Sequence, residues 1–476
     1  MLVEGSLRRD DGDSSTARAL RARSARNDTV RLTTAAVANP WVGIVALVAI
    51  LLAMLAVLRA VRDRFAPHPE LMRKMAHVGL GLTVLTFPWL FRSPWPVVVM
   101  GVLAIGTLLA LRFVPRLRAT VGGVVHGVHR SSAGDLYFPI AATGLFLLAE
   151  GNWVLYTVPM LTLTLADAVA AVIGVAYGRH AYGTTSTKKT VEGSIAFFVV
   201  AFLATAGPLF VAAIPRDKAI LIGLTFGVLV MLLEAVAWRG LDNLFIPFGG
   251  FLLLRAYLGL DETALLARFL ATLGLLVLVL FLRRRRTLDD FALGAGVLIG
   301  YVAWAAGGWR WLIPPCVLFA AYTVLWPRRA QLRDRPHDIT AVFSVTATGI
   351  LWLLLAIVFQ RPELYYPYTL AYAANLCFIG ITWYRNFRRP DAAIEGIAAS
   401  ALVAWAAFFV PYVIVVGLAR TAVLPALLAI VPLLVAGIVF TLVIPHIRRR
   451  PTTDYPWASQ ALVGLASAAM GLILLA

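Results

Sequence analysis

Apolar runs of about 20 residues recur along this chain from Trp41 to the C-terminus, and they limit the folds that it can adopt. Hydrophobic residues make up 61% of the 476 residues, and charged residues only 14%. A helix needs roughly 20 mostly apolar residues to cross the hydrocarbon core of a bilayer. The runs are continuous rather than alternating, which favours helices over a β-barrel. The sequence therefore predicts an all-α fold, a polytopic integral membrane bundle.

The runs predict about 14 to 16 transmembrane helices. The candidate spans are 41–59, 75–91, 95–113, 136–150, 153–178, 193–214, 218–238, 244–260, 262–282, 288–306, 308–326, 338–359, 366–384, 393–417, 421–445 and 457–476.

Three regions differ in composition. Residues 1–39 are rich in Arg, Ser and Ala and are interpreted as a disordered tail. In residues 40–282, a first membrane domain, polar residues recur within or beside the spans. In residues 283–476, a second membrane helical domain, the spans hold few acids, and the residues by themselves assign this domain no role.

The net charge of +18 comes from basic residues spread through the loops between spans. If the 59–74 loop is cytoplasmic and every span crosses, 27 of the 42 Lys and Arg residues lie in cytoplasmic loops, and eight lie in outer loops or within spans. This bias is typical of the positive-inside rule rather than of nucleic-acid binding. It predicts the orientation of the spans but leaves open the side on which the tail lies.

Asp167 lies inside an apolar run, where a carboxylate costs roughly 2.5–3.5 kcal/mol on insertion scales. Ionisable residues in such positions tend to be functional and to face the interior of the bundle. Gly174 and Gly178 follow at spacings of seven and four, so all three residues share one helical stripe. The stripe predicts the close approach of a ligand or, alternatively, of a packed helix with the acid paired to a base.

The loop after this stripe resembles a phosphate cradle. Its lysines supply positive charge, its hydroxyls and backbone N–H groups supply donors, and the next helix adds a favourable dipole. The candidate nucleotide-binding residues here are Gly174, Gly178, Lys188, Lys189, Thr190, Glu192 and Gly193. Asp167 and Glu192, with Asp242 as a third ligand, are predicted to hold Mg²⁺. A Lys-Lys pair in a cytoplasmic loop is more often only a determinant of topology, and no P-loop sequence occurs.

Other polar residues are predicted on the same face of the membrane. His77 follows Arg73 and Lys74 at the start of a span, and it is either a buried structural histidine or a base or phosphate contact. Asp135 begins another span. Asp242 and Asn243 follow Glu234 beyond the end of a third, and they could bind a cation or cap a helix. These segments are far apart in sequence, and we expect them to assemble into one site.

The ordered motifs resemble the CTP-dependent lipid-alcohol kinases, which include phytol kinase and dolichol kinase. The resemblance covers about 60–260. An early Arg-Lys-x-x-His-x-x-x-Gly motif is matched by Arg73, Lys74, His77 and Gly81. A Gly-Glu-x-Tyr-Phe-Pro motif is matched from Gly134 to Pro139, with Asp135 in place of Glu. The other matching positions are Asp167, Ala170, Gly174, Gly178, Lys188, Lys189, Thr190, Glu192, Gly193, Glu234, Gly240, Asp242, Asn243 and Pro247.

This resemblance implies CTP as phosphoryl donor and a membrane-embedded isoprenoid alcohol, of the phytol or polyprenol type, as acceptor. The hypothesis places Asp167, Asp135 and His77 in catalysis, with Asp135 or His77 accepting the alcohol proton. Arg73, Lys74 and Asn243 join the nucleotide-binding residues. The predicted partners are CTP, the lipid alcohol and the bilayer, with no nucleic acid, and the site faces the cytoplasm.

The second domain is similar at Gly294–Arg310 to the membrane family that includes phytyl-phosphate kinase. The acidic motif of that family is missing, and Ala373-Ala374-Asn375-Leu376 is the nearest stretch. Two other functions for the whole chain stay open. One is a CTP-using phosphatidate cytidylyltransferase, and the other is a lipid transporter or an ion-coupled transporter that uses Asp167.

Overall fold

The computed structural model describes residues 39–65, 69–114, 134–183, 188–237, 240–282, 290–325, 339–387, 393–443 and 457–473. The chain divides into two compact units. Unit 1 comprises Met1–Ala181 and Lys189–Phe269, and unit 2 comprises Tyr182–Lys188 and Leu270–Ala476. The predicted disordered tail lies outside the described residues, apart from Asn39.

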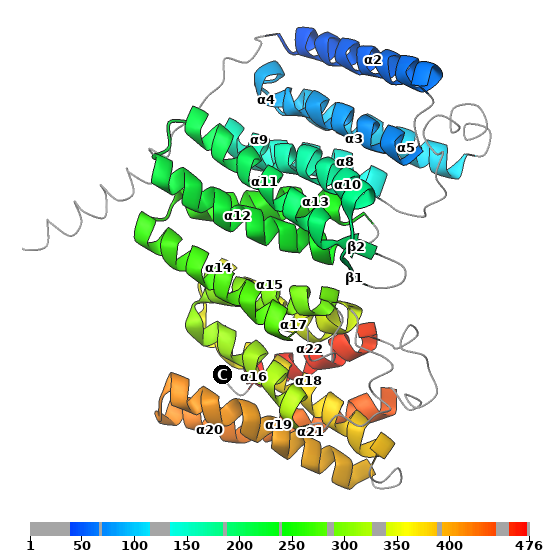
Figure 1. The fold of residues 1–476 in the computed structure, drawn as a ribbon. Helices are drawn as coiled ribbons and strands as arrows, with labels where there is room; N and C mark the ends of the chain where they lie inside the picture. The colour runs from blue at the N-terminus through cyan, green and yellow to red at the C-terminus, as the bar shows by residue number, and fades with distance from the viewer. Residues whose placement is uncertain are drawn as a thin grey trace, which may run out of the picture. The chain divides into compact units, whose positions relative to one another are not determined.

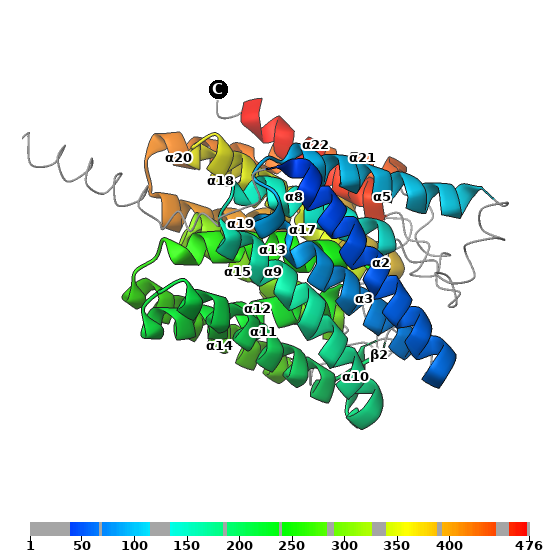
Figure 2. The same ribbon diagram turned by 90° about the horizontal axis from the view of Figure 1, so that it is seen from above.

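Unit 1 contains helices that run alongside one another, and α2 and α3 lie side by side (Figures 1 and 2). Its elements are α2 (Pro40–Phe65), α3 (Pro69–Leu85), α4 (Phe87–Leu90), α5 (Trp95–Phe113), α8 (Gly134–Ala149), α9 (Trp153–Leu161), the π-helical segment η1 (Thr162–Ala166), α10 (Asp167–Tyr177), β1 (Ala181–Gly183), β2 (Lys188–Thr190), α11 (Val191–Val211), α12 (Arg216–Val236), α13 (Asp242–Leu258) and the first part of α14 (Glu262–Leu282).

Unit 2 begins within α14 and has a core centred on α18. Its helices are α15 (Asp290–Gly307), α16 (Trp309–Leu325), α17 (Ile339–Val358), the 3₁₀ segment η4 (Pro362–Leu364), α18 (Tyr365–Phe387), α19 (Ala393–Val416), α20 (Arg420–Leu428), α21 (Ile430–Val443) and α22 (Trp457–Ile473).

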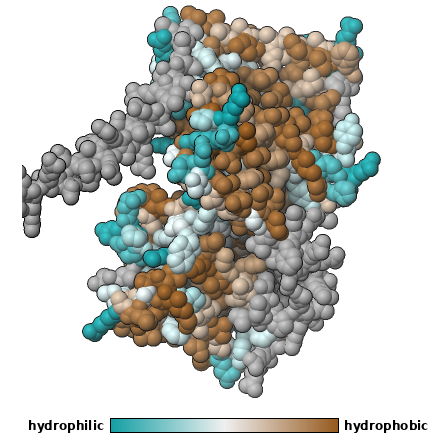
Figure 3. All heavy atoms as spheres, turned by 60° about the vertical axis from the view of Figure 1, so that its left-hand side comes forward, coloured by the Kyte–Doolittle hydropathy of each residue, from teal (hydrophilic) through white to brown (hydrophobic). Residues whose placement is uncertain are grey.

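Each of the sixteen predicted spans coincides with helix, and the predicted all-α membrane bundle is confirmed. Seven helices are long and apolar enough to cross a membrane by length and composition, and five shorter apolar helices accompany them. Apolar side chains also cover outward faces: Val175 is 82% exposed and Ile394 84% exposed. Hydrophobic residues occupy much of the surface visible in Figure 3. Helices that are apolar on every side are typical of proteins whose outer surface contacts lipid.

The loop predicted after Gly178 is partly ordered as a hairpin. Its strands β1 and β2 pair in a two-stranded sheet, and β2 leads directly into α11. Thr190 ends the strand in an extended conformation and caps α11, because its hydroxyl accepts a hydrogen bond from the Gly193 N–H at 3.2 Å. The hairpin therefore fixes where the chain of this polar segment enters α11.

The predicted span 153–178 is one helix with an irregular turn. Pro159, which has no N–H to donate, lies just before the π-helical segment η1. The hydroxyls of Thr162 and Thr164 donate to carbonyls four residues back, at 2.8 and 2.7 Å. Single π-helical turns inside α-helices occur frequently at functional sites. This one ends immediately before Asp167.

Candidate active site

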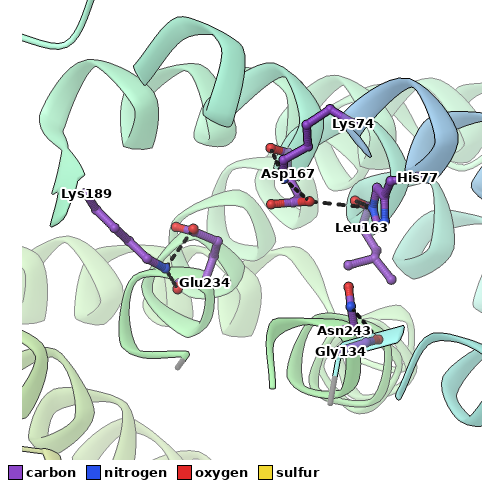
Figure 4. A network of polar contacts seen from close by, with 8 residues as sticks. All are labelled: Lys74, His77, Gly134, Leu163, Asp167, Lys189, Glu234 and Asn243. Atoms are coloured by element: carbon purple, nitrogen blue, oxygen red, sulfur yellow. Dashed lines mark hydrogen bonds and ion pairs between the residues drawn. The ribbon is translucent and has the colours of Figure 1, made fainter. Parts of the chain in front are cut away.

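Two side chains of α3 contact Asp167, which lies at the start of α10 (Figure 4). The Lys74 ammonium donates to the Asp167 carboxylate at 2.7 Å and lies 3.5 Å from its backbone carbonyl. His77 Nε2 lies 3.5 Å from the same carboxylate oxygen and 3.3 Å from the carbonyl oxygen of Leu163 in η1. The first predicted motif and the in-span aspartate thus meet in one cluster.

This cluster is largely buried. The side chains of Lys74 and Asp167 are 8% and 13% exposed, and that of His77 is 16% exposed. Taking two charges out of water is expensive, and breaking such a pair by removing one partner is strongly destabilising. Retaining it within an apolar helix bundle points to a function that needs the charges.

Gly81 explains how α3 comes close enough to form the cluster. A methyl group at position 81 would overlap the side chain of Thr164 in η1. The absence of a side chain therefore lets α3 pack directly against the π-helical turn. His77 lies one helical turn before Gly81, which places its ring over Leu163.

A second ion pair lies near the first, between β2 and α12 (Figure 4). The Lys189 ammonium donates to the Glu234 carboxylate at 2.8 Å and also to the Glu234 backbone carbonyl. The two side chains are 19% and 14% exposed. Lys189 is therefore held at the end of α12, whereas the side chain of Lys188 lies outside the described residues.

The start of α13 joins this region to α8. The Asn243 amide donates to the Gly134 carbonyl at 2.8 Å, so it ties two helix starts together rather than capping its own helix. Asp242 interacts electrostatically with Asp167, Lys74 and Lys189, which places it between the two ion pairs in charge terms. Asp135 is exposed in the first turn of α8, one turn before Phe138, whose ring contacts that of His77.

The structure does not bring Glu192 to Asp167. The Glu192 carboxylate lies 2.7 Å from Nδ1 of His180 and accepts hydrogen bonds from the His180 backbone N–H at 3.3 Å. The described residues hold no group of three or more His, Cys, Asp or Glu that could bind a metal ion. Glu192 thus contacts His180, beyond the opposite end of α10 from Asp167, and the magnesium site predicted from Asp167, Glu192 and Asp242 stays a prediction.

The glycine stripe packs a helix. A methyl group on Gly174 would come within 3.0 Å of the Thr190 hydroxyl, and one on Gly193 within 2.9 Å of the Ala170 carbonyl. Gly178 likewise faces Thr190. These residues let α10 and α11 approach closely, which is the packing alternative for the stripe. Their predicted contact with a nucleotide stays a prediction.

Arg73 is exposed and interacts with Asp167 through its charge. Sequence reasoning did not identify Glu234 as the partner of Lys189, the Leu163 carbonyl as a contact of His77, or His180 as the partner of Glu192. An acid four residues inside a span was the available signal for Glu234. No local signal marks a backbone carbonyl or an exposed histidine.

No protein-family model matches the chain, and no solved structure matches it. Among curated proteins, the chain is similar to phytol kinase from Synechocystis sp., with 27% identity over 201 residues. The match covers 39% of this chain and 78% of that protein. The fold and the buried ion pairs define a polytopic membrane protein with a charged interior site. The similarity agrees with the resemblance of the motifs to phytol kinase and related lipid-alcohol kinases.

Proposed function

We propose that the chain is a kinase that transfers a phosphoryl group from CTP to the hydroxyl of a membrane-embedded isoprenoid alcohol. The observation that carries this proposal is the buried Lys74–Asp167–His77 cluster at the π-helical turn. The similarity to a phytol kinase supports the reaction class and the acceptor class. CTP comes from the motif resemblance alone, and the bias of basic loop residues supports a cytoplasmic site.

In the proposed reaction, the alcohol oxygen attacks the γ-phosphorus of CTP, and the bond to the bridging oxygen breaks to release CDP. Catalysis of such transfers rests on positioning and charge stabilisation. Lys74 and Lys189, with Arg73 beside Asp167, offset the charge that develops on the phosphate oxygens. The alcohol proton passes to His77, whose Nε2 lies 3.5 Å from the Asp167 carboxylate. Asp135, at the exposed start of α8, is the other acceptor.

Asp167 and Asp242 are the residues proposed to hold Mg²⁺. They lie within electrostatic range of each other, and Mg²⁺ is usually bound by one or two carboxylates together with substrate phosphates. The bound ion would neutralise charge on the nucleotide. The proposed set leaves out Glu192, because its carboxylate contacts His180, which lies beyond the opposite end of α10 from Asp167.

The direct test uses purified protein in lipid nanodiscs, CTP labelled at either the α- or the γ-phosphate, and a panel of lipid alcohols. A kinase moves the γ-label to phytol or a related alcohol. Transfer of the α-label to phosphatidate would instead identify a cytidylyltransferase, and absence of any transfer would reject both enzymes. Asp167→Asn should lower transfer by about 10²- to 10³-fold. Asp217→Asn, an exposed acid at the opposite end of α12 from Glu234, should not.

A further inference from the structure

A groove of about 520 Å³ lies between α2, α3 and α10 in unit 1. Helix α2 contributes Met54, Val57 and Leu58, whereas α3 and α10 form the rest of the wall. The lining from α3 and α10 comprises Leu71, Lys74, Met75, Val78, Gly79, Leu82, Ala168, Val169, Val172 and Ile173. The volume falls within the range of roughly 300–1,000 Å³ that is typical of small-molecule sites.

All lining residues are apolar except Lys74. Lys74 lines the groove with its apolar stem, and its ammonium is bonded to Asp167, so the groove passes beside the candidate active site. Ala168 and Val169, which follow Asp167 directly, belong to the same wall. The groove thus joins an apolar wall to the charged cluster, as the binding site of a molecule with one polar end would do.

The groove is open along its length. Val57, Leu82 and Val172 in its wall are 60%, 51% and 44% exposed. Leu82 is eight residues beyond Lys74, so the wall continues for about 12 Å along α3 from Lys74. Gly79 lets α2 approach α3 at this wall, since a methyl group there would lie 2.6 Å from Met54 Sδ. Met54 and Met75 have flexible side chains that can adapt to a branched chain.

We infer that this groove binds the apolar tail of the acceptor alcohol and places its hydroxyl at Lys74 and Asp167. The inference rests on the proposed function for the identity of the ligand. The occupant is a single acyclic hydrocarbon chain with a terminal hydroxyl. Its tail enters sideways from the hydrocarbon core, because the exposed lining residues Val57 and Val172 lie on helices that are long and apolar enough to cross a membrane.

If the tail of the alcohol occupies this groove, a substitution that blocks the groove should affect long acceptors more than short ones. Leu82 is eight residues after Lys74, about 12 Å along α3, so a Trp there obstructs a long tail that follows α3 and spares a short one. Leu82→Trp should raise the KM for phytol about tenfold or more, because one methylene in an apolar pocket is already worth about tenfold. The KM for prenol, the single-isoprene alcohol, should stay near that of the unmodified protein.

Val175→Trp is the matched control. It places the same side chain on α10 at a position that is 82% exposed and outside the groove. Val78→Trp repeats the test at a second lining position of α3 and covers the case in which Leu82→Trp does not fold. Equal KM values for phytol in the groove variants and the Val175→Trp control would overturn the inference.

Photolabelling separates this inference from the proposed function. A diazirine analogue of phytol, used on the unmodified protein in nanodiscs without nucleotide, should label peptides of α2, α3 and α10, and excess phytol should suppress the label. Labelling of these peptides in a protein that phosphorylates no alcohol would reject the kinase but support the groove. Phosphorylation of phytol with labelling confined to other helices would reject the groove alone.

Discussion

The two units of this protein use polar residues inside the membrane in different ways. Unit 1 buries ion pairs, Lys74 with Asp167 and Lys189 with Glu234. Among the described residues of unit 2, every buried polar side chain is neutral. There the Asn375 amide donates to the carbonyls of Val345 and Ala371 and accepts from Gln460 at 3.0 Å.

The difference separates packing from chemistry. A neutral network whose donors and acceptors are matched can fix how helices pack without desolvating a charge. Buried charges cost more than they return unless the geometry is excellent. In unit 2 the Asn375 contacts hold helices together without a charge. Unit 1 keeps its charges, which indicates that they serve a reaction.

The strongest test of this difference between the units is to place a buried charge in unit 2. Asn375→Asp removes the donor to two carbonyls and leaves a carboxylate facing them. An uncompensated buried charge should lower the free energy of unfolding by about 3–5 kcal/mol. Thermal unfolding in detergent measures this. The same change at Asn152, which caps α9, should be nearly neutral because Asp caps equally well. An unchanged unfolding temperature for Asn375→Asp would contradict the comparison.

Removing the charge from unit 1 should affect catalysis next most strongly. Asp167→Asn keeps the shape of the side chain but removes the charge paired with Lys74. We expect labelled-phosphate transfer to fall by about 10²- to 10³-fold, the range for loss of one electrostatic stabiliser. Glu395→Gln in unit 2, where the acid lies in the first turn of α19, serves as control. Similar losses in both variants would show that the effect is not specific to the site.

The close contact between α3 and η1 predicts a smaller effect. Gly81→Ala forces α3 away from Thr164 and should cost about 1–3 kcal/mol, as other overpacked positions do. Because Lys74 and His77 move with α3, kcat should fall more than KM for CTP rises. Gly106→Ala on α5 is the control, since no atom lies within 4 Å of the added methyl group. A fully active Gly81→Ala protein would refute the role given to this contact.

The smallest effect is expected at Glu192, which the proposed set of magnesium ligands leaves out. Glu192→Gln should change the Mg²⁺ concentration needed for half-maximal activity little, since its carboxylate contacts His180. Asp242→Asn should raise that concentration clearly, because Asp242 interacts with Asp167. A magnesium titration of both variants measures this. The reverse order would restore Glu192 as a metal ligand and displace Asp242.

Most of the fold was predictable because each span carries its own signal. A run of apolar residues must be helical in lipid whatever its neighbours are, and the predicted spans agree with the helices. The sequence did not predict the places where the helical structure is interrupted inside a span. The π-helical turn before Asp167 depends on Pro159 and two threonine hydroxyls acting together. The short strands of the hairpin have no periodic signal in a polar segment.

The site was predictable only as a set of candidates. Ionisable residues in apolar helices are costly and tend to be functional, so the sequence singles out Lys74, His77 and Asp167. The structure places these three residues together. Glu192 and Glu234 show where this reasoning ends. Both are acids near a helix end, but one pairs with an exposed histidine and the other with a buried lysine.

The sequence by itself determined that this chain is a helical membrane protein, which residues are out of place in lipid, and which motifs they form. These properties follow from local composition and from the absence of water in the bilayer core. Only the tertiary structure decided which lysine faces which acid, which glycine admits which helix, and that an apolar groove passes beside Lys74. Those choices depend on contacts between helices far apart in sequence, and no local pattern records them.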